Sequence, residues 1–269
     1  MTNPLHNDRF PLASKYDRDW IFKHQMGPNA LWLMEWLCGE MNLQPGMRVL
    51  DMGCGMAMSS IFLAREFDLQ VWATDLWIPA TYNRARIEEQ GLSDRVFPIH
   101  AEASALPYAE DFFDAIVSVD AYHYFGLAEG FLDAFSHLVR PGGEIGIVVP
   151  GRLVECDDDD PPEHLAAWLS HQPGAFATWQ SAAFWRQRFE ATPDVQVQCA
   201  DAMEDGWRDW VAFTELTVAA GEERPKGNRE GACQEIEAIR ADAGRTMGFV
   251  RVVARREAPA GGQAPPPSD

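Results

Sequence analysis

The sequence predicts an α/β fold, a doubly wound and mostly parallel sheet of seven strands with a helical lid insertion. Short apolar segments alternate with segments of helical periodicity between residues 48 and 149, which is typical of parallel strands covered by helices on both faces. A glycine turn at residues 53–55 connects the first of these strands directly to a helix, as in nucleotide-binding sheets. Acidic residues follow several predicted strands, at the edge where such sheets bind ligands.

The composition fits one large domain. The chain has 269 residues, of which 46% are hydrophobic, enough for one α/β core with or without a small lid. Its formal net charge of −19 argues against electrostatic binding to nucleic acid or to an anionic membrane. We find no signal-peptide pattern and no apolar run that could span a bilayer. The five cysteines are scattered without a C-x-x-C pair, which predicts a reducing, cytoplasmic location.

The first part of the chain is predicted to form a cap and then a helix. Residues 1–27 are polar, rich in aromatic residues and interrupted by two prolines, so we expect an N-terminal cap segment. Pro28 suits a first helical turn, and apolar residues recur at helical spacing from 31 to 41. These features predict a helix over about 28–42, which the turn Gln44-Pro45-Gly46 ends.

Residues 28–150 form the predicted core, in which apolar segments and helical segments alternate. The composition favours strands over about 48–51, 70–74, 95–99, 115–119 and 144–149. Helices are predicted between them, over about 57–66, 79–90 and 128–139. The turn Pro141-Gly142-Gly143 leads into the fifth strand.

The pattern changes after residue 150. Residues 151–192 contain an acidic run, two prolines and a group of aromatic residues, and we interpret them as a mostly helical lid that covers the mouth of the site. Four adjacent acids point in several directions, so the run at 157–160 is interpreted as a solvated loop and no metal site is predicted. Residues 193–256 complete the same domain with two strands, about 195–199 and 249–254. Residues 257–269, rich in Ala, Gly and Pro, are predicted to be disordered.

Two acidic residues at strand ends could bind the ribose and the base of a nucleoside. Asp75 lies 20 residues after Gly55, at the end of the second strand, where a carboxylate can accept hydrogen bonds from both hydroxyls of a ribose. Leu76 and Trp77 follow it and could pack against a purine. Glu102 follows the third strand and could accept a hydrogen bond from the exocyclic amine of adenine. The alternative for each acid is a solvated loop residue or a helix cap.

These segments resemble the class I S-adenosylmethionine-dependent methyltransferases, over about residues 28–150. Five motifs carry the resemblance in the family's order: VLDMGCG at 49–55, TD at 74–75, AEASALP at 101–107, FDAIVS at 113–118 and LVRPGG at 138–143. The sequence departs from the family at Met56 and Ala101. The resemblance implies a Rossmann-like methyltransferase fold, S-adenosyl-L-methionine as cofactor and methyl transfer by in-line displacement. It implies cofactor contacts at Asp51, Gly53, Cys54, Gly55, Asp75, Leu76, Trp77, Ala101, Glu102, Ala103, Ser118 and Asp120.

The sequence defines the residues that would bind and activate the methyl acceptor less clearly. His123 resembles the first histidine of a pair that many small-molecule methyltransferases carry after the fourth strand, and an imidazole can serve as a general base. Tyr122 is the second catalytic candidate. The predicted substrate pocket combines residues of the cap, the loop after the fourth strand and the lid: Tyr16, Trp20, His24, Tyr124, Trp179 and Trp185. Packing without a catalytic role is the alternative for each.

The leading hypothesis is a methyltransferase that acts on a small-molecule acceptor, with neither nucleic acid nor membrane as partner. An NAD-dependent oxidoreductase on the same kind of sheet is the first alternative, although Met58 stands where the third glycine of the dinucleotide motif belongs. A non-catalytic protein that retains the cofactor pocket is the second. The sequence leaves open the acceptor, the atom that is methylated and the oligomeric state, for which a homodimer is one option.

Overall fold

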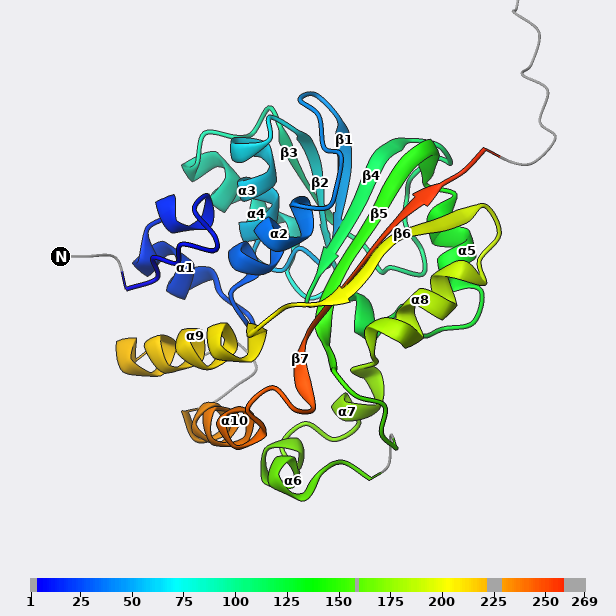
Figure 1. Ribbon diagram of the computed structural model, residues 1–269. Helices are drawn as coiled ribbons and strands as arrows, with labels where there is room; N and C mark the ends of the chain where they lie inside the picture. The colour runs from blue at the N-terminus through cyan, green and yellow to red at the C-terminus, as the bar shows by residue number, and fades with distance from the viewer. Residues whose placement is uncertain (1–3, 158–159, 222–228, 259–269) are drawn as a thin grey trace, which may run out of the picture.

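A seven-stranded sheet runs through the molecule (Figure 1). The computed structural model describes residues 4–157, 160–221 and 229–258. The strand order is β3-β2-β1-β4-β5-β7-β6. The strands are β1 Arg48–Met52, β2 Gln70–Asp75, β3 Val96–His100, β4 Phe113–Val119, β5 Val139–Arg152, β6 Val195–Ala202 and β7 Met247–Arg256.

The sheet is parallel except at one edge. Strands β1 to β5 pair in parallel, whereas β7 lies antiparallel to both β5 and β6. The central strands are buried on both faces, as the continuous apolar runs in the sequence predicted. The prediction of a doubly wound, mostly parallel seven-stranded sheet is therefore confirmed.

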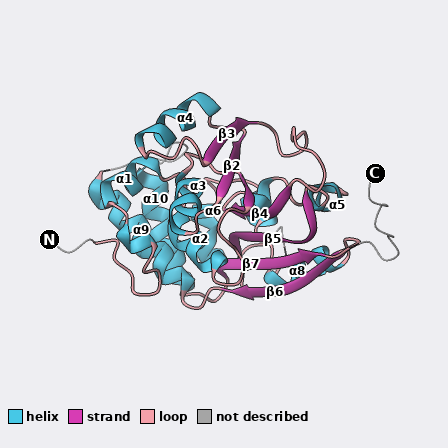
Figure 2. Cartoon of the chain, turned by 90° about the horizontal axis from the view of Figure 1, so that it is seen from above, coloured by secondary structure: helices cyan, strands magenta, loops and turns pink. Residues whose placement is uncertain are grey.

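Helices cover the two faces of the sheet unequally (Figure 2). The larger hydrophobic core packs α1 Arg18–His24, α2 Ala30–Cys38, α3 Met58–Glu66, α9 Gly206–Ala220 and α10 Arg229–Asp242 against one face. The smaller core packs α5 Phe131–Ser136 and α8 Ala182–Glu190 against the other face. Helix α4 Ala80–Glu89 contacts β3. Two short 3-10 helices, η1 Ala13–Lys15 and η2 Tyr122–Tyr124, complete this part of the chain.

Side-chain caps fix where two helices near the site begin. Asp17 accepts a hydrogen bond from the backbone N–H of Trp20 at the start of α1. Asn29 accepts from the N–H groups of Leu31 and Trp32, and α2 begins at the next residue, Ala30. Such caps satisfy N–H groups that have no partner inside the helix.

The described residues of the segment 151–192 include three helices, which pack as part of the body of the domain. It contains α6 Glu163–Leu169 and α7 Ala175–Thr178 before α8. Helix α6 contacts α10, and α8 contacts β6 and β7. The rings of Trp168 and Trp179 stack at 5.2 Å, and Trp168 also packs on Trp210 of α9. The lid stays a prediction, and Trp168, Trp179 and Trp185 lie in the two hydrophobic cores.

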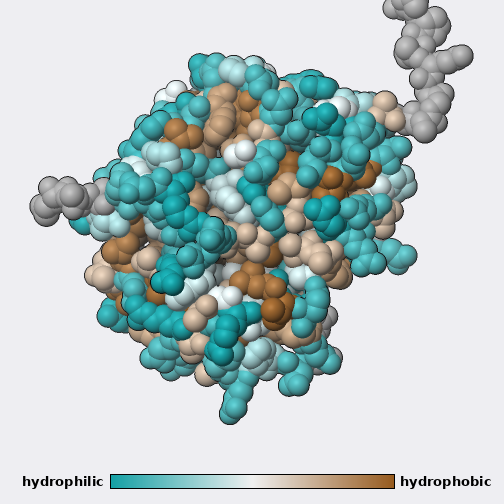
Figure 3. All heavy atoms as spheres, in the orientation of Figure 1, coloured by the Kyte–Doolittle hydropathy of each residue, from teal (hydrophilic) through white to brown (hydrophobic). Residues whose placement is uncertain are grey.

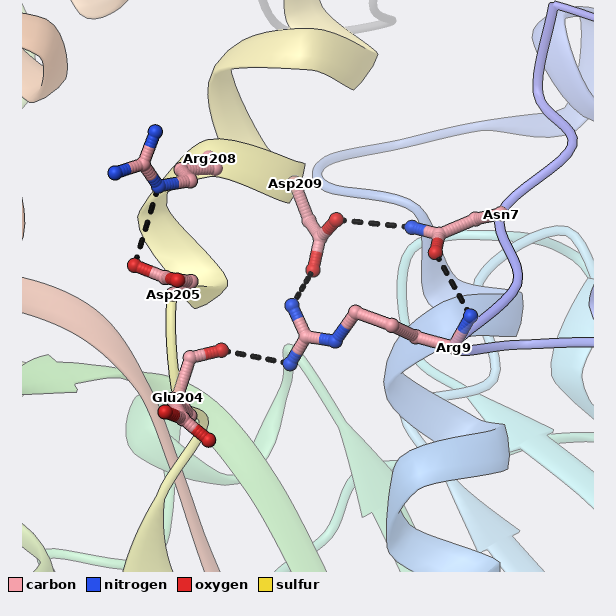
Figure 4. A network of polar contacts seen from close by, with 6 residues as sticks. All are labelled: Asn7, Arg9, Glu204, Asp205, Arg208 and Asp209. Atoms are coloured by element: carbon pink, nitrogen blue, oxygen red, sulfur yellow. Dashed lines mark hydrogen bonds and ion pairs between the residues drawn. The ribbon is translucent and has the colours of Figure 1, made fainter.

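The N-terminal segment is anchored to α9 by a network of polar contacts (Figure 4). Arg9 Nη1 donates to Asp209 Oδ2 at 2.6 Å, and Arg9 Nη2 donates to the carbonyl oxygen of Glu204 at 2.6 Å. Asn7 donates to the other oxygen of Asp209 at 2.9 Å. Further along, the carboxylate of Glu35 accepts from two backbone N–H groups at the start of η1. These contacts hold the segment that precedes α1 against the domain.

The face of the molecule in Figure 3 is mostly hydrophilic, with small hydrophobic areas between polar side chains. Over the described residues, no helix has the length and apolar character needed to cross a membrane. Of the tail 257–269, which is predicted to be disordered, residues 259–269 lie outside the described residues. Residues 158–159 of the acidic run lie outside them as well.

Candidate functional site

A cavity of about 520 Å³ lies beyond the carboxyl ends of β1, β2 and β4. This volume is in the range of pockets that hold cofactors and small ligands. Its wall combines the glycine turn after β1, the loops after β2, β3 and β4, and residues 24–30 of the N-terminal segment. Open parallel sheets bind ligands at this edge.

The glycine turn is fixed by hydrogen bonds to the neighbouring strand. The N–H groups of Gly53 and Cys54 both donate to the carbonyl oxygen of Thr74, at 2.8 and 3.1 Å. Gly53 has φ of 78°, and a Cβ at this position would lie 2.3 Å from the Cβ of Ala121. Only glycine fits this close approach between the turn and the loop after β4. The bare backbone of the turn therefore forms part of the cavity wall.

Asp75 links the glycine turn to the loop after β2. Its Oδ2 accepts from the N–H of Gly55 at 2.8 Å, and its Oδ1 accepts from the N–H groups of Trp77 and Ile78 at 2.7 and 2.9 Å. The side chain is buried at the cavity wall. A carboxylate offers about four lone-pair positions, so this one retains acceptor capacity towards the cavity.

Asp51 lies behind the glycine turn. It is buried, and its Oδ2 accepts from the hydroxyls of Ser59 and Ser60, each at 2.6 Å. Burial raises its pKa to about 6, although the two serine hydrogen bonds act in the opposite direction. Asp51 is not among the residues of the cavity wall, and neither are Ala101 and Ser118, which we predicted as cofactor contacts. Ser118 is buried and donates to the carbonyl oxygen of Met52.

Glu102, Ala103 and Asp120 do reach the cavity wall. Asp120 follows β4, and its N–H donates to the carbonyl oxygen of Val148 in β5. Its φ of 54° turns the chain out of the sheet at this residue. The predicted cofactor contacts at Gly53, Cys54, Gly55, Asp75, Leu76 and Trp77 also line the cavity.

Apolar side chains surround the mouth of the cavity. Leu76, Trp77 and Tyr124 are exposed and belong to its wall. The rings of Trp77 and Tyr124 are 5.2 Å apart. His100 contacts the carbonyl oxygen of Leu76 through Nε2 at 2.8 Å and so holds the loop after β2. Desolvation of the Tyr124 hydroxyl, together with the nearby Asp120 carboxylate, raises the pKa of Tyr124 to about 12.

The two predicted catalytic residues do not reach the cavity. Tyr122 is fully buried, and its ring packs on Trp185 at 5.4 Å in the smaller core. Burial raises the pKa of its hydroxyl. His123 is 2% exposed, and burial lowers its pKa to about 3. Neither is among the residues that line the cavity, and their catalytic roles stay predictions.

The predicted substrate pocket is only partly assembled. His24 lines the cavity with Tyr124, and its Nδ1 contacts the carbonyl oxygen of Trp20 at 2.7 Å. Tyr16 is buried and donates to Glu66, and Trp20 packs between Tyr16 and His24. Trp179 and Trp185 lie in the two hydrophobic cores. Tyr16, Trp20, Trp179 and Trp185 are not among the residues that line the cavity, and their place in the substrate pocket stays a prediction.

Several residues of the wall were not predicted. They come from the end of the N-terminal segment and from the chain after β4, and include Met26, Gly27, Pro28, Phe125, Ala128 and Phe131. Pro28 marked the start of a helix in the sequence, but nothing local showed that the residues before it cross the sheet edge. Over the described residues, no group of three or more His, Cys, Asp or Glu side chains is arranged to hold a metal ion.

Comparison with known proteins agrees with this geometry. The family model described as "Methyltransferase domain" matches residues 49–143, which contain the glycine turn and the acids at the strand ends. The methyltransferase GfsG of Streptomyces halstedii is 31% identical over 125 residues, which is 45% of this chain and 45% of that protein. A demethylmenaquinone methyltransferase of Mycobacterium sp. (strain KMS) is 26% identical over 73% of this chain and 76% of its own length.

A similar fold occurs among solved structures. A putative sarcosine dimethylglycine methyltransferase from Galdieria sulphuraria has a TM-score of 0.67 and 18% identity, with 85% of each chain covered. The chain spans less than half the length of the first curated relatives that it matches. The family model over residues 49–143, these relatives and the shared fold support a class I S-adenosylmethionine-dependent methyltransferase.

Proposed function

We propose that this protein transfers a methyl group from S-adenosyl-L-methionine to a small-molecule acceptor. The observation that carries the proposal is the cavity itself, whose wall contains the glycine turn, Asp75 and Glu102 from three separate loops. These are the positions at which the family resemblance implies cofactor contacts. The cavity extends beyond them towards Asp120 and Phe131, which leaves room for an acceptor.

The loops after β2 and β3 would bind the adenosyl part of the cofactor. Asp75 would accept hydrogen bonds from the ribose hydroxyls with the acceptor capacity that its three backbone partners leave. Leu76 and Trp77 offer an apolar surface to the purine, and Glu102 offers an acceptor to its exocyclic amine. These roles follow from the chemistry of the side chains at the wall.

The start of α3 would bind the methionine part of the cofactor. Helix α3 begins after Ala57, which has φ of 61° and gives no side-chain cap to the first turn. Met58 and Ser59 of this turn line the cavity. Backbone N–H groups at a helix start attract a carboxylate.

The bound cofactor supplies an electrophilic methyl group on a sulfonium. The chain's residues bind the donor, align it with the acceptor and exclude water. Holding two reactants in near-attack geometry can lower the activation free energy by roughly 7–11 kcal/mol. The turn at 53–55 and residues of the segment 24–30 both contribute to the cavity wall, which suits this positioning role.

Calorimetry with S-adenosylhomocysteine and with NAD tests the proposal. We expect the protein to bind S-adenosylhomocysteine and to show no comparable affinity for NAD. Binding of NAD alone would favour the oxidoreductase alternative. Tight binding of S-adenosylhomocysteine without methyl transfer to any member of a broad nucleophile panel would favour a non-catalytic protein.

The proposal includes a cytoplasmic location, which the five free cysteines support. It also includes an acceptor other than nucleic acid, because the net charge of −19 would repel phosphates. A homodimer stays a prediction, and light scattering of the purified protein tests it.

A further inference from the structure

His24 is the side chain of the cavity wall that can take up a positive charge. The described residues of the wall include no lysine and no arginine, whereas Asp75, Glu102 and Asp120 are among them. The methionine part of S-adenosylmethionine ends in a carboxylate, and a carboxylate that loses water on binding needs a partner. His24 lies in the wall with 5% of its surface exposed. Among the described side chains of the wall, His24 alone can offer this carboxylate a cation.

One ring nitrogen of His24 is used inside α1. Its Nδ1 lies 2.7 Å from the carbonyl oxygen of Trp20, one helical turn earlier, and the two rings pack with centroids 5.2 Å apart. A carbonyl oxygen only accepts hydrogen bonds, so Nδ1 carries the hydrogen of the neutral ring. The proton that turns the ring into a cation therefore adds to Nε2. This atom has no hydrogen-bond partner among the described residues.

The segment that contains His24 lies against the glycine turn that leads into α3. A Cβ atom at Gly55 would be 2.8 Å from Sδ of Met26, two residues after His24. The ring of Tyr16, which precedes α1, packs on Phe62 of α3 with centroids 5.8 Å apart. The first turn of α3 lines the same cavity. His24 and the N–H groups at the start of α3 therefore contribute to one wall.

His24 is neutral in the free protein at pH 7. Burial lowers its pKa below the usual 6.5, and the charges of Arg86 in α4 and of Lys23 lower it as well. The hydrogen bond to the Trp20 carbonyl and the charge of Glu89 act in the opposite direction. A neutral ring offers a lone pair at Nε2 and cannot donate to a carboxylate there. An anion at Nε2 reverses the preference, because a nearby opposite charge favours the charged form.

We propose that His24 binds the carboxylate of the cofactor as an imidazolium, together with the N–H groups at the start of α3, so that cofactor binding takes up a proton. The inference rests on the proposed function, which supplies the ligand. One proton from water adds to Nε2, after which Nδ1 donates to Trp20 and Nε2 donates to the carboxylate. This second contact is a charge-assisted hydrogen bond. By reciprocity, affinity for the cofactor falls as rising pH removes the proton from the bound imidazolium.

Calorimetry of the unmodified protein in buffers of different ionisation enthalpy tests this inference at pH 7. The probes are S-adenosylhomocysteine and 5′-methylthioadenosine, which share the adenosyl group and the thioether. The second probe has no carboxylate and no ammonium group. We expect S-adenosylhomocysteine to take up a proton, in a fraction between zero and one, and 5′-methylthioadenosine to take up none. The affinity for S-adenosylhomocysteine should fall from pH 6 to pH 8, by at most about tenfold per pH unit.

His24→Gln supplies the residue-level test, because glutamine keeps an amide donor but does not titrate. Proton uptake should disappear, and S-adenosylhomocysteine should bind at least about 5-fold more weakly, since hydrogen bonds to charged groups contribute roughly 1.5–3 kcal/mol. Affinity for 5′-methylthioadenosine should change less than about twofold. His171→Gln is the matched control. Nδ1 of His171 contacts the carbonyl oxygen of Ala167, also four residues earlier, at 3.1 Å, but His171 is exposed and outside the described wall.

The outcomes separate this inference from the proposed function. Binding of S-adenosylhomocysteine without proton uptake would overturn the inference, as would equal uptake with 5′-methylthioadenosine or unchanged uptake in His24→Gln. Proton release would also overturn it, because release would mean that neutral His24 accepts from the ammonium group of the ligand. In each of these cases, S-adenosylhomocysteine binding would leave the methyltransferase proposal standing. Failure of the unmodified protein to bind S-adenosylhomocysteine would instead refute the proposed function.

Discussion

The backbone of Gly27 lies directly against the carboxyl group of Asp120, so that a Cβ atom at residue 27 would be 2.2 Å from Oδ2. This approach joins the N-terminal segment to the loop after the central strand β4. The two residues are far apart in the sequence, and both line the cavity. The absence of a side chain at position 27 therefore sets how closely the N-terminal segment covers the site.

Gly27→Ala should disturb this contact. The added methyl group overlaps Asp120, and overpacking of this kind costs about 1–3 kcal/mol. We expect a lower melting temperature and a smaller stabilisation by S-adenosylhomocysteine, both measured by thermal unfolding. The double variant Gly27→Ala with Asp120→Ala removes the overlap and should regain most of the melting temperature. A single Gly27→Ala variant as stable as the parent would show that the contact is not tight in solution.

Asp75→Asn should weaken cofactor binding. An asparagine replaces one acceptor oxygen by an NH2 group, which would face either the N–H of Gly55 or those of Trp77 and Ile78. Hydrogen bonds to charged groups contribute roughly 1.5–3 kcal/mol, so affinity for S-adenosylhomocysteine should fall at least about 10-fold in calorimetry. Asp94→Asn, an exposed acid before β3, is the matched control and should bind normally. Equal affinity in both variants would contradict the ribose assignment.

Asp51 should make stability depend on pH. Its pKa is raised from 3.8 to about 6 in the folded protein, so the folded state holds this proton more tightly than the unfolded state does. The protein therefore loses stability as pH rises from about 4 to 6, by roughly 3 kcal/mol at 1.36 kcal/mol per pKa unit. Asp51→Asn removes this loss. Urea unfolding of both proteins at pH 4 to 8 should give curves that diverge across this window, and parallel curves would refute the assignment.

His123→Asn tests the packing role of His123. Because burial lowers the pKa of His123 to about 3, the folded state resists its protonation. The parent should lose stability relative to the variant as pH falls from about 6.5 towards 3. Turnover at neutral pH should change less than about threefold in initial-rate measurements. A large drop in turnover with an intact fold would restore the catalytic base that the sequence suggested.

The contact between Arg9 and Asp209 offers a test of the N-terminal anchor. Asp209 is partly buried, with 15% of its side chain exposed, and it accepts from both Arg9 and Asn7. A double-mutant cycle with Arg9→Ala and Asp209→Asn should give a coupling free energy of about 0.2–1 kcal/mol in urea unfolding. Single variants should also speed proteolysis of the N-terminal segment. A coupling free energy of zero, with unchanged proteolysis, would mean that Asn7 and Glu35 hold the segment alone.

Local patterns in the sequence predicted those site residues whose position follows from the strand just before them in the chain. The glycine turn, Asp75 and Glu102 each follow an apolar strand, and parallel pairing brings strand ends to one edge. The residue type did not show whether an aromatic ring faces a cavity or a core. The burial of Trp185 and His123 could not be predicted from the sequence, since it depends on how α8 and η2 pack. The approach of Gly27 to Asp120 was also not predictable, because it joins segments that share no local pattern.

The position of β7 in the sheet constrains the order of assembly. Strand β6 pairs with β7 and with no other described strand, yet two helices, α9 and α10, separate them in the chain. During synthesis β6 therefore leaves the ribosome before its pairing partner exists, and the edge of β5 stays open for the same interval. The delay of some forty residues gives that open edge time to meet other chains. Chaperone dependence of this protein should accordingly concentrate in the interval between the emergence of β6 and that of β7.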